Sequence, residues 1–199
     1  MELITKHLLS LVVFLPMVFG LIILMIPIRT ASCPTWIKTT ALVFSIIEFA
    51  LSMLLWTGFD SSLVGFQFAE KHNWIPAFGI SYNIGIDGIS LLLIMLTTFL
   101  TPIVLLCSWT AVEEKIKPFL FCMLALETGM LGAFVALDII LFYSFWEAML
   151  IPMYLLIGVW GGKDRIYASM KFFIFTLVGS LLMLVAILYL IFQYKSQFG

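Results

Sequence analysis

Glu147 lies in the middle of an apolar stretch, residues 138–160, that is long enough to cross a bilayer. A carboxylate at that depth costs several kcal/mol unless it is protonated, paired or hydrated, so such an acid is a candidate functional group. Pro152 follows five residues later and has no backbone N–H, which leaves the carbonyl oxygen of Ala148 without its helical donor. The sequence predicts a buried acid beside a loosened helix, although a protonated packing residue next to an ordinary kink would give the same pattern.

The polar side chains near Glu147 are spaced for one side of a helix. If residues 139–160 form a single helix, positions three and four apart fall on the same face. The residues that share this face are Tyr143, Glu147, Ile151, Tyr154 and Gly158, with Ser144 beside them. We therefore expect a polar lane along an otherwise apolar helix.

Two further acids, Glu48 and Glu127, occupy the middle of predicted spans. Almost no loop separates the span of Glu127 from that of Glu147, so the two helices form an antiparallel hairpin. Both acids then lie about 14 Å from the shared turn, at a rise of 1.5 Å per residue, which makes a shared proton path possible. For Glu48 the sequence leaves two roles open, that of a protonated structural acid and that of a functional group.

Small residues in the span of Glu127 predict a close helix contact. Glu127 lies about 200° around the helix from the position two residues further on, so it is expected to point away from this contact. The small residues are Ala125, Gly129, Ala133 and Ala136.

The composition is that of an integral membrane protein. With 63% hydrophobic residues, 11% charged residues and a mean hydropathy of +1.18, the 199-residue chain is too apolar for a soluble globule. A net charge of -1 without any basic cluster argues against a nucleic-acid partner. The three cysteines show no C-x-x-C spacing and only His7 and His72 are available, so no metal or haem site is predicted.

We expect an all-α membrane protein with six transmembrane helices and a β-hairpin within residues 58–86. Polarity rises after residue 58, and residues 66–68 and 78–84 alternate as strands do, which favours a hairpin on the membrane surface. Asp87 and Asp138 are expected to cap the helices that follow them. The predicted spans are residues 8–26, 36–57, 87–109, 118–137, 139–160 and 170–192. The chain thus divides into a segment with two spans (1–58), a segment with the hairpin (59–86) and a segment with four spans (87–199).

Basic residues predict the orientation in the membrane, because cytoplasmic loops carry the excess of Lys and Arg. Most of them flank one side of the predicted spans, namely Arg29, Lys38, Lys115, Lys117, Lys163, Arg165 and Lys171, against Lys6, Lys71 and Lys195 on the other side. Both termini are therefore expected outside the cytoplasm.

Four segments resemble a known family: GIDGISL (85–91), LTPIVLLCSW (100–109), FWEAMLIPMY (145–154) and YASMKFF (167–173). They are similar to the chain M family of antiporter-like membrane subunits of proton-pumping NADH:quinone oxidoreductase, bacterial respiratory complex I, which is related to Mrp-type antiporters. The resemblance runs along essentially the whole chain. It implies a bacterial inner-membrane location, two inverted repeats that each contain a broken helix, and proton movement along buried carboxylates and lysines.

The resemblance also implies roles for particular residues. Glu147 matches the family's functional glutamate, whose charge state is coupled to a lysine on the seventh helix, and Glu127 resembles an additional acid of many relatives. Pro152 resembles a family kink, and Lys171 lies in a matching motif at the cytoplasmic edge of its helix, where its side chain can reach the interface. This sequence contains only the first six spans, and the only Lys or Arg residues within them, Lys38 and Lys171, lie at span edges. The cation that partners Glu147 is therefore expected outside this sequence.

The function that follows is proton transfer as part of a membrane subunit coupled to quinone reduction. A cation moving toward or away from Glu147 would make the acid release or capture a proton. The chain has no dinucleotide, flavin or cluster motif, so NADH, FMN, iron–sulfur clusters and quinone are expected in partner subunits, together with the other membrane subunits of complex I as partners. The alternatives are an Mrp-type Na⁺/H⁺ antiporter subunit and a truncated scaffold that conducts nothing.

Overall fold

The computed structural model describes residues 7–26, 33–76 and 79–198. In this part of the chain, six segments are long and apolar enough to cross a membrane, and the predicted all-α fold is confirmed. They are α2 (Leu8–Met25), α3 (Cys33–Gly58), α4 (Gly88–Cys107), α5 (Ile116–Val135), α6 with α7 (Ile139–Ala148 and Leu150–Trp160), and α8 (Arg165–Phe198).

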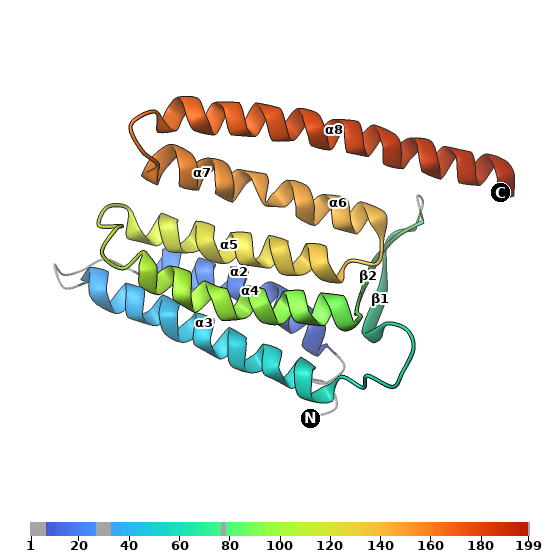
Figure 1. The fold of residues 1–199 in the computed structure, drawn as a ribbon, viewed down its shortest axis with the longest axis horizontal. Helices are drawn as coiled ribbons and strands as arrows, with labels where there is room; N and C mark the ends of the chain where they lie inside the picture. Colours follow the sequence, from blue (N-terminus) through green and yellow to red (C-terminus); the bar gives the residue numbers. More distant parts are fainter. Residues whose placement is uncertain (1–6, 27–32, 77–78, 199) are drawn as a thin grey trace.

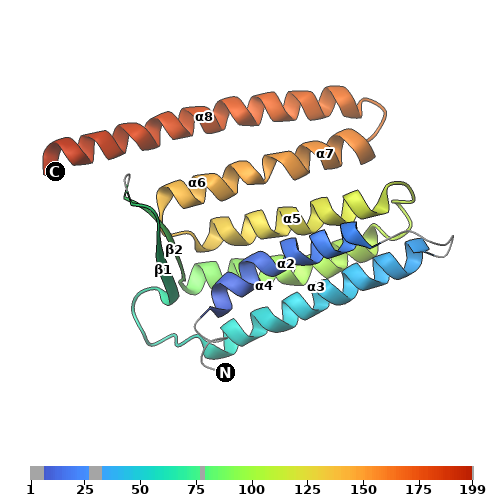
Figure 2. The ribbon, with the colours of Figure 1, turned by 180° about the vertical axis from the view of Figure 1, so that it is seen from behind.

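The helices run side by side as a bundle in which α8 forms one edge (Figures 1 and 2). Helix α2 packs along α5 and α3, and α4 packs against α3 and α5. On the other side of α5, α6 and α7 separate it from α8. Most of α8 is therefore exposed, and it projects beyond α6 at its last turns (Figure 1).

Two expected helices differ from the observed ones. The expected continuous helix over residues 139–160 is interrupted at Met149, which separates α6 from α7. Helix α8 begins at Arg165 and ends at Phe198 rather than covering residues 170–192, because the apolar pattern marks only the part that spans the membrane. The charged residues at both ends of α8 continue the same helix.

The expected hairpin is confirmed as two antiparallel strands, β1 (Gln67–Ile75) and β2 (Ile80–Ile86). The strands pair Glu70 with Ile84 and His72 with Tyr82, after a bulge at which Phe68 has a φ of 50°. The end of β2 is part of the bundle, since Ile84 and Ile86 are fully buried in the cluster that also holds Leu9 and Val135. The hairpin is thus fixed to one end of the helices.

Two aspartates cap the helices that they precede, as expected. The Asp87 carboxylate accepts from the Ser90 backbone N–H at 2.7 Å, and this hydrogen bond lowers the pKa of Asp87. Asp138 accepts from the backbone N–H groups of Ile140 (2.9 Å) and Leu141 (3.3 Å). Its second oxygen accepts from the Ser81 backbone N–H at 3.0 Å, so the same side chain also holds β2 against the turn between α5 and α6.

At the opposite end of the bundle, a lysine of α3 holds the connection between α4 and α5. Lys38 donates to the carbonyl oxygens of Trp109 (2.6 Å) and Val112 (2.7 Å) in this connection. The first turn of α2 and the last turn of α8 lie at the hairpin end (Figure 1). Lys6, Arg29 and the side chain of Lys195 lie outside the described residues, and which end faces the cytoplasm stays a prediction.

Candidate functional site

Helix α3 carries a polar stripe into the interior of the bundle. Ser45, Glu48 and Ser52 are spaced three and four residues apart, so they share one face of the helix. All three are buried, and the exposed fraction of Glu48 is 1%. Ser52 also hydrogen-bonds Thr98 of α4 through their hydroxyl groups at 2.9 Å, so the stripe continues across the contact between α3 and α4.

Glu127 of α5 enters the same region from the other side. Its exposed fraction is also 1%, and its carboxyl group interacts electrostatically with that of Glu48. Thr101 of α4 lies close to Glu127, but its hydroxyl donates to the Thr97 carbonyl oxygen at 3.0 Å. Three helices thus bring two carboxyl groups together inside the bundle.

These carboxyl groups have no hydrogen-bond partner within the described chain. This holds for both oxygens of Glu48 and of Glu127, and the neighbouring Thr128 hydroxyl is equally unpartnered. Unpartnered polar groups are costly in an apolar interior, so an acid at mid-membrane must hold a proton or meet a cation or water from elsewhere. Packing alone does not account for two such acids side by side.

Glu147 occupies a different environment, in the last turn of α6. One of its carboxyl oxygens is buried and unpartnered in the described chain. The Tyr143 hydroxyl, one helical turn earlier, lies close to this carboxyl group and to the Ser180 hydroxyl of α8. Glu147 therefore faces α8.

The interruption at Met149 lies next to this acid. Met149 keeps helical backbone angles (φ -70°, ψ -24°), and α7 starts at Leu150, so Pro152 falls in the first turn of α7. Pro152 has no N–H to donate to the Ala148 carbonyl oxygen, and the first turn of a helix tolerates a proline in this way. The loosened backbone expected at Ala148 is thus the end of α6.

Glu127 and Glu147 are not brought together by this fold. Helix α5 meets α6 through its glycines: a Cβ on Gly132 would lie 2.3 Å from the Phe145 ring, and one on Gly129 would lie 2.4 Å from Met149. Each acid is two positions from these contact residues, about 200° around its helix, so both point away from the α5–α6 contact. The expected close contact is confirmed at Gly129, whereas the observed partner of Glu127 is Glu48.

The remaining predicted residues divide between two surfaces of α6 and α7. Tyr154 donates to the Met170 sulfur at 3.6 Å and stacks edge-on with Phe173 at 5.5 Å, so it faces α8 together with Glu147. Ser144 instead lines a groove of about 430 Å³ between α6, α2 and the hairpin. Lys171 is exposed on α8, with its Nζ 5.7 Å from the centre of the Tyr167 ring.

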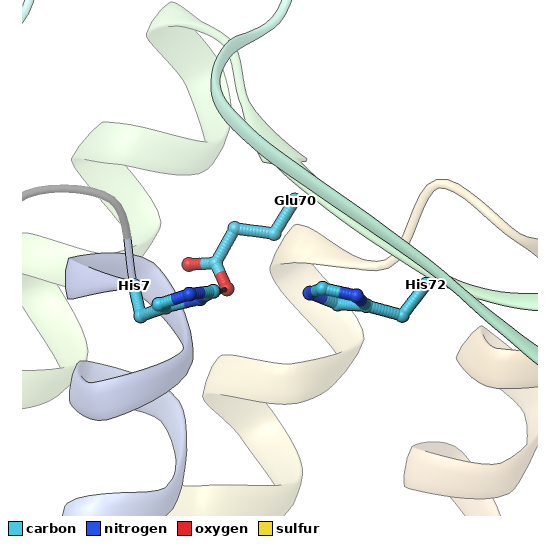
Figure 3. Close-up of side chains that lie close together, drawn as sticks. All are labelled: His7, Glu70 and His72. Carbon is cyan, nitrogen blue, oxygen red and sulfur yellow. Dashed lines mark hydrogen bonds and ion pairs between the residues drawn. The ribbon is translucent and has the colours of Figure 1, made fainter. Parts of the chain in front are cut away.

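The sequence alone did not decide the role of Glu48, although the spacing of polar residues around it indicated a buried polar face. The spacing of Ser45, Glu48 and Ser52 places three polar residues on one helix face, which identifies a buried polar stripe. The hairpin supplies a second cluster that the sequence analysis did not expect, in which His7, Glu70 and His72 lie together (Figure 3). It was missed because His7 and Glu70 are 63 residues apart and meet only when β1 folds back onto α2.

Family models match almost the whole chain. One described as NADH-ubiquinone oxidoreductase chain 4, amino terminus, matches residues 11–133, and one described as NADH:quinone oxidoreductase/Mrp antiporter, TM, matches residues 136–198. NADH-quinone oxidoreductase subunit M of Rhodobacter capsulatus is 46% identical over 182 residues, which cover 91% of this chain and 35% of the relative. NADH-ubiquinone oxidoreductase chain 4 of Mycosarcoma maydis is 42% identical over 189 residues, which cover 94% of this chain and 39% of that relative.

Solved structures share the fold. A chain of respiratory complex I from Thermus thermophilus with bound NADH superimposes with a TM-score of 0.74 and 30% identity, covering 90% of this chain and 35% of that one. A chain of the Mrp complex from Dietzia sp. DQ12-45-1b has a TM-score of 0.72 at 17% identity, a likeness of fold alone. The chain thus spans little more than a third of the length of the curated relatives described above.

Proposed function

Because this chain belongs to the family of NADH-ubiquinone oxidoreductase chain 4, we propose that it is the amino-terminal part of a proton-translocating membrane subunit of an NADH:quinone oxidoreductase. The buried carboxyl groups of Glu48, Glu127 and Glu147 carry this proposal. Three acids on three spans have carboxyl oxygens without a partner in the described chain. Such acids are costly unless they are protonated, paired or hydrated, which makes them candidates for proton exchange.

The acids fall into two groups with different roles. Glu48 and Glu127 interact electrostatically inside the bundle, so a change in the charge of one carboxyl group acts on the other. Glu147 faces α8 and acts as a switch that a cation outside the described chain controls. Tyr143 is placed to hydrogen-bond Glu147, and the break before Pro152 gives the acid room to move.

The other predicted residues have supporting roles. Tyr154 holds α7 against α8, and Ser144 adds a hydroxyl on the hairpin side of α6, where it donates to the Ile140 carbonyl oxygen at 2.8 Å. Lys171 places its charge at the loop end of α8, in the position expected for the cytoplasmic interface. No transfer step is assigned to these three residues.

The remaining chemistry is assigned to partners. We place the subunit in the bacterial inner membrane among the other membrane subunits of complex I, with NADH, FMN, iron–sulfur clusters and quinone bound by partner subunits. Under this proposal residues 1–58 and 87–199 form the membrane part, and residues 59–86 form an extracytoplasmic hairpin that docks on it.

The proposal is tested by carboxyl-to-amide substitutions in the assembled complex. Glu147→Gln and Glu127→Gln should each lower NADH-driven proton uptake by inverted vesicles, relative to quinone reduction, by about a hundredfold or more, the lower end of the usual scale for a proton-transferring group. Glu113→Gln, which removes an exposed carboxyl group between α4 and α5, is the matched control. Wild-type pumping in both test variants, with normal assembly, would contradict the proposal and favour a scaffold that conducts nothing.

An Mrp-type antiporter is the second candidate, because the family model over residues 136–198 covers both groups of proteins. The two functions differ in what drives the proton. Sodium-dependent proton flux in vesicles without NADH, abolished by Glu147→Gln, would favour the antiporter. Flux that requires NADH and quinone favours the oxidoreductase subunit.

A further inference from the structure

We propose that His7, Glu70 and His72 form a binding site for a divalent transition metal ion, best matched by Zn²⁺, at the hairpin end of the bundle (Figure 3). His7 precedes α2, and Glu70 and His72 are two residues apart on β1. One ligand atom from each residue lies within 4.8 Å of the other two. This proposal rests on the hairpin geometry and does not depend on proton transfer.

The donor set is one that zinc prefers. Two imidazole nitrogens and one carboxylate oxygen supply three ligands of a tetrahedral site and leave the fourth position for water. In such a site, ligand atoms about 2.0 Å from the ion lie about 3.4 Å from one another. His7 Nδ1 and Glu70 Oε2 already lie 3.1 Å apart, and the exposed His72 side chain can turn toward them.

Glu70 is held in place as metal ligands usually are. It is buried, with an exposed fraction of 6%, although it lies on a strand whose neighbouring residues are mostly exposed. Its Oε1 accepts from the Ser10 backbone N–H at 3.0 Å, and its Oε2 accepts from the Ser10 hydroxyl at 2.6 Å. Outer hydrogen bonds of this kind fix the orientation of a ligand.

Tyr82 and the aromatic rings complete the surroundings. The Tyr82 hydroxyl is 2.8 Å from the Ser10 hydroxyl, and burial raises the pKa of Tyr82, so this hydroxyl keeps its proton. The His72 ring stacks loosely against those of His7 (5.9 Å) and Tyr82 (6.4 Å), which keeps it beside the other two ligands. A bound ion would fasten β1 to the start of α2.

The two ligand histidines are the only histidines of the sequence, so histidine labelling of this chain reports on the proposed site alone. The assembled complex is stripped with a chelator and treated with diethylpyrocarbonate, with or without ZnCl₂, and labelling of each histidine is read by peptide mass spectrometry. We expect Zn²⁺ to protect His7 and His72 together, EDTA to restore labelling, and Mg²⁺ to give no protection, because Mg²⁺ prefers oxygen ligands.

Variants separate a metal site from a simple His7–Glu70 ion pair. In His72→Asn, an exposed and therefore mild change, zinc should no longer protect His7. In Ser10→Ala, which removes only an outer hydrogen bond, half-protection should need about 10- to 100-fold more zinc. Labelling of His7 that is indifferent to zinc in the wild type, or protection of His7 that persists in His72→Asn, would overturn the proposal.

Discussion

Glu48 of α3 and Glu127 of α5 are both buried and interact electrostatically, so the protonation of one affects the other. A pair that interacts in this way acts as one unit, so the effects of its substitutions do not add. Glu147 lies beyond the α5–α6 contact and is expected to act as a separate unit. The residues themselves therefore predict which double substitutions will be non-additive.

We expect Glu48→Gln and Glu127→Gln to be non-additive in proton pumping. The double variant should lose less activity than the product of the two single losses, because each substitution removes the charge interaction through which one acid acts on the other. The measurement is the initial rate of NADH-driven acidification in vesicles for the two single variants and the double variant. Fully multiplicative losses would show that the two carboxyl groups act independently.

The sequence predicted the depth of the buried acids better than their partners. Hydropathy placed Glu48, Glu127 and Glu147 at mid-span, because depth follows from position within an apolar stretch. The facing of Glu127 toward Glu48 depends on how α3 and α5 pack, and no local pattern encodes a contact between residues so far apart. For the same reason, the contact between His7 and Glu70 could not be predicted from the sequence.

At the scale of elements, the α5–α6 contact depends on glycine. In Gly132→Ala the new methyl group would lie 2.3 Å from the Phe145 ring, so the ring or the helices must shift. Overpacking of this kind costs about 1–3 kcal/mol, and we expect a lower thermal midpoint for loss of the assembled complex. Gly179→Ala is the matched control, since a Cβ there meets nothing within 4 Å on α8.

A smaller side chain at position 145 should reverse this effect. Phe145→Leu combined with Gly132→Ala should recover most of the lost midpoint, because the clash is with the ring alone. If Gly132→Ala has the same midpoint as the control, the tight contact between α5 and α6 is wrong.

The break at Met149 predicts a functional effect of Pro152. In Pro152→Ala the restored N–H can donate to the Ala148 carbonyl oxygen and join α6 to α7, which stiffens the backbone beside Glu147. We expect normal assembly and quinone reduction but fewer protons pumped per NADH. Pro118→Ala changes a proline at the same position in the first turn of α5, away from the acids, and should leave this ratio unchanged.

Local sequence patterns predicted some features of the helices and strands but not others. Asp87 and Asp138 were predictable as caps because a cap depends on a few adjacent residues. The hairpin was predictable from its alternation, but its anchoring by Asp138 to Ser81 was not. The ends of α8 were misplaced because helix continues through its charged ends, past the limits that an apolar pattern can mark.

At the scale of the whole molecule, the basic residues predict that the hairpin end faces away from the cytoplasm. In a background without native cysteines, Val64→Cys at the hairpin end and Glu113→Cys at the other end present exposed thiols. A membrane-impermeant maleimide should label position 64 in intact spheroplasts and position 113 only in inverted vesicles. The opposite labelling would reverse the orientation.

The exposed side of α8 fits a chain that spans little more than a third of its relatives' length. Glu147 faces α8, and no Lys or Arg in the described chain forms an ion pair with it, so we propose that the cation that controls it is supplied from outside the described chain. The proposed switch is therefore a property of the assembled protein, and it has to be measured there.

Infrared difference spectroscopy of the complete complex tests the central claim most directly, because the C=O stretch of a protonated carboxyl group is distinct from that of a carboxylate. The difference spectrum between the resting and the NADH-reduced complex should contain a protonated-carboxyl band. This band should disappear in Glu147→Gln and persist in Glu113→Gln. An unchanged band in Glu147→Gln, or no such band in the wild type, would contradict a change of protonation at Glu147 during turnover.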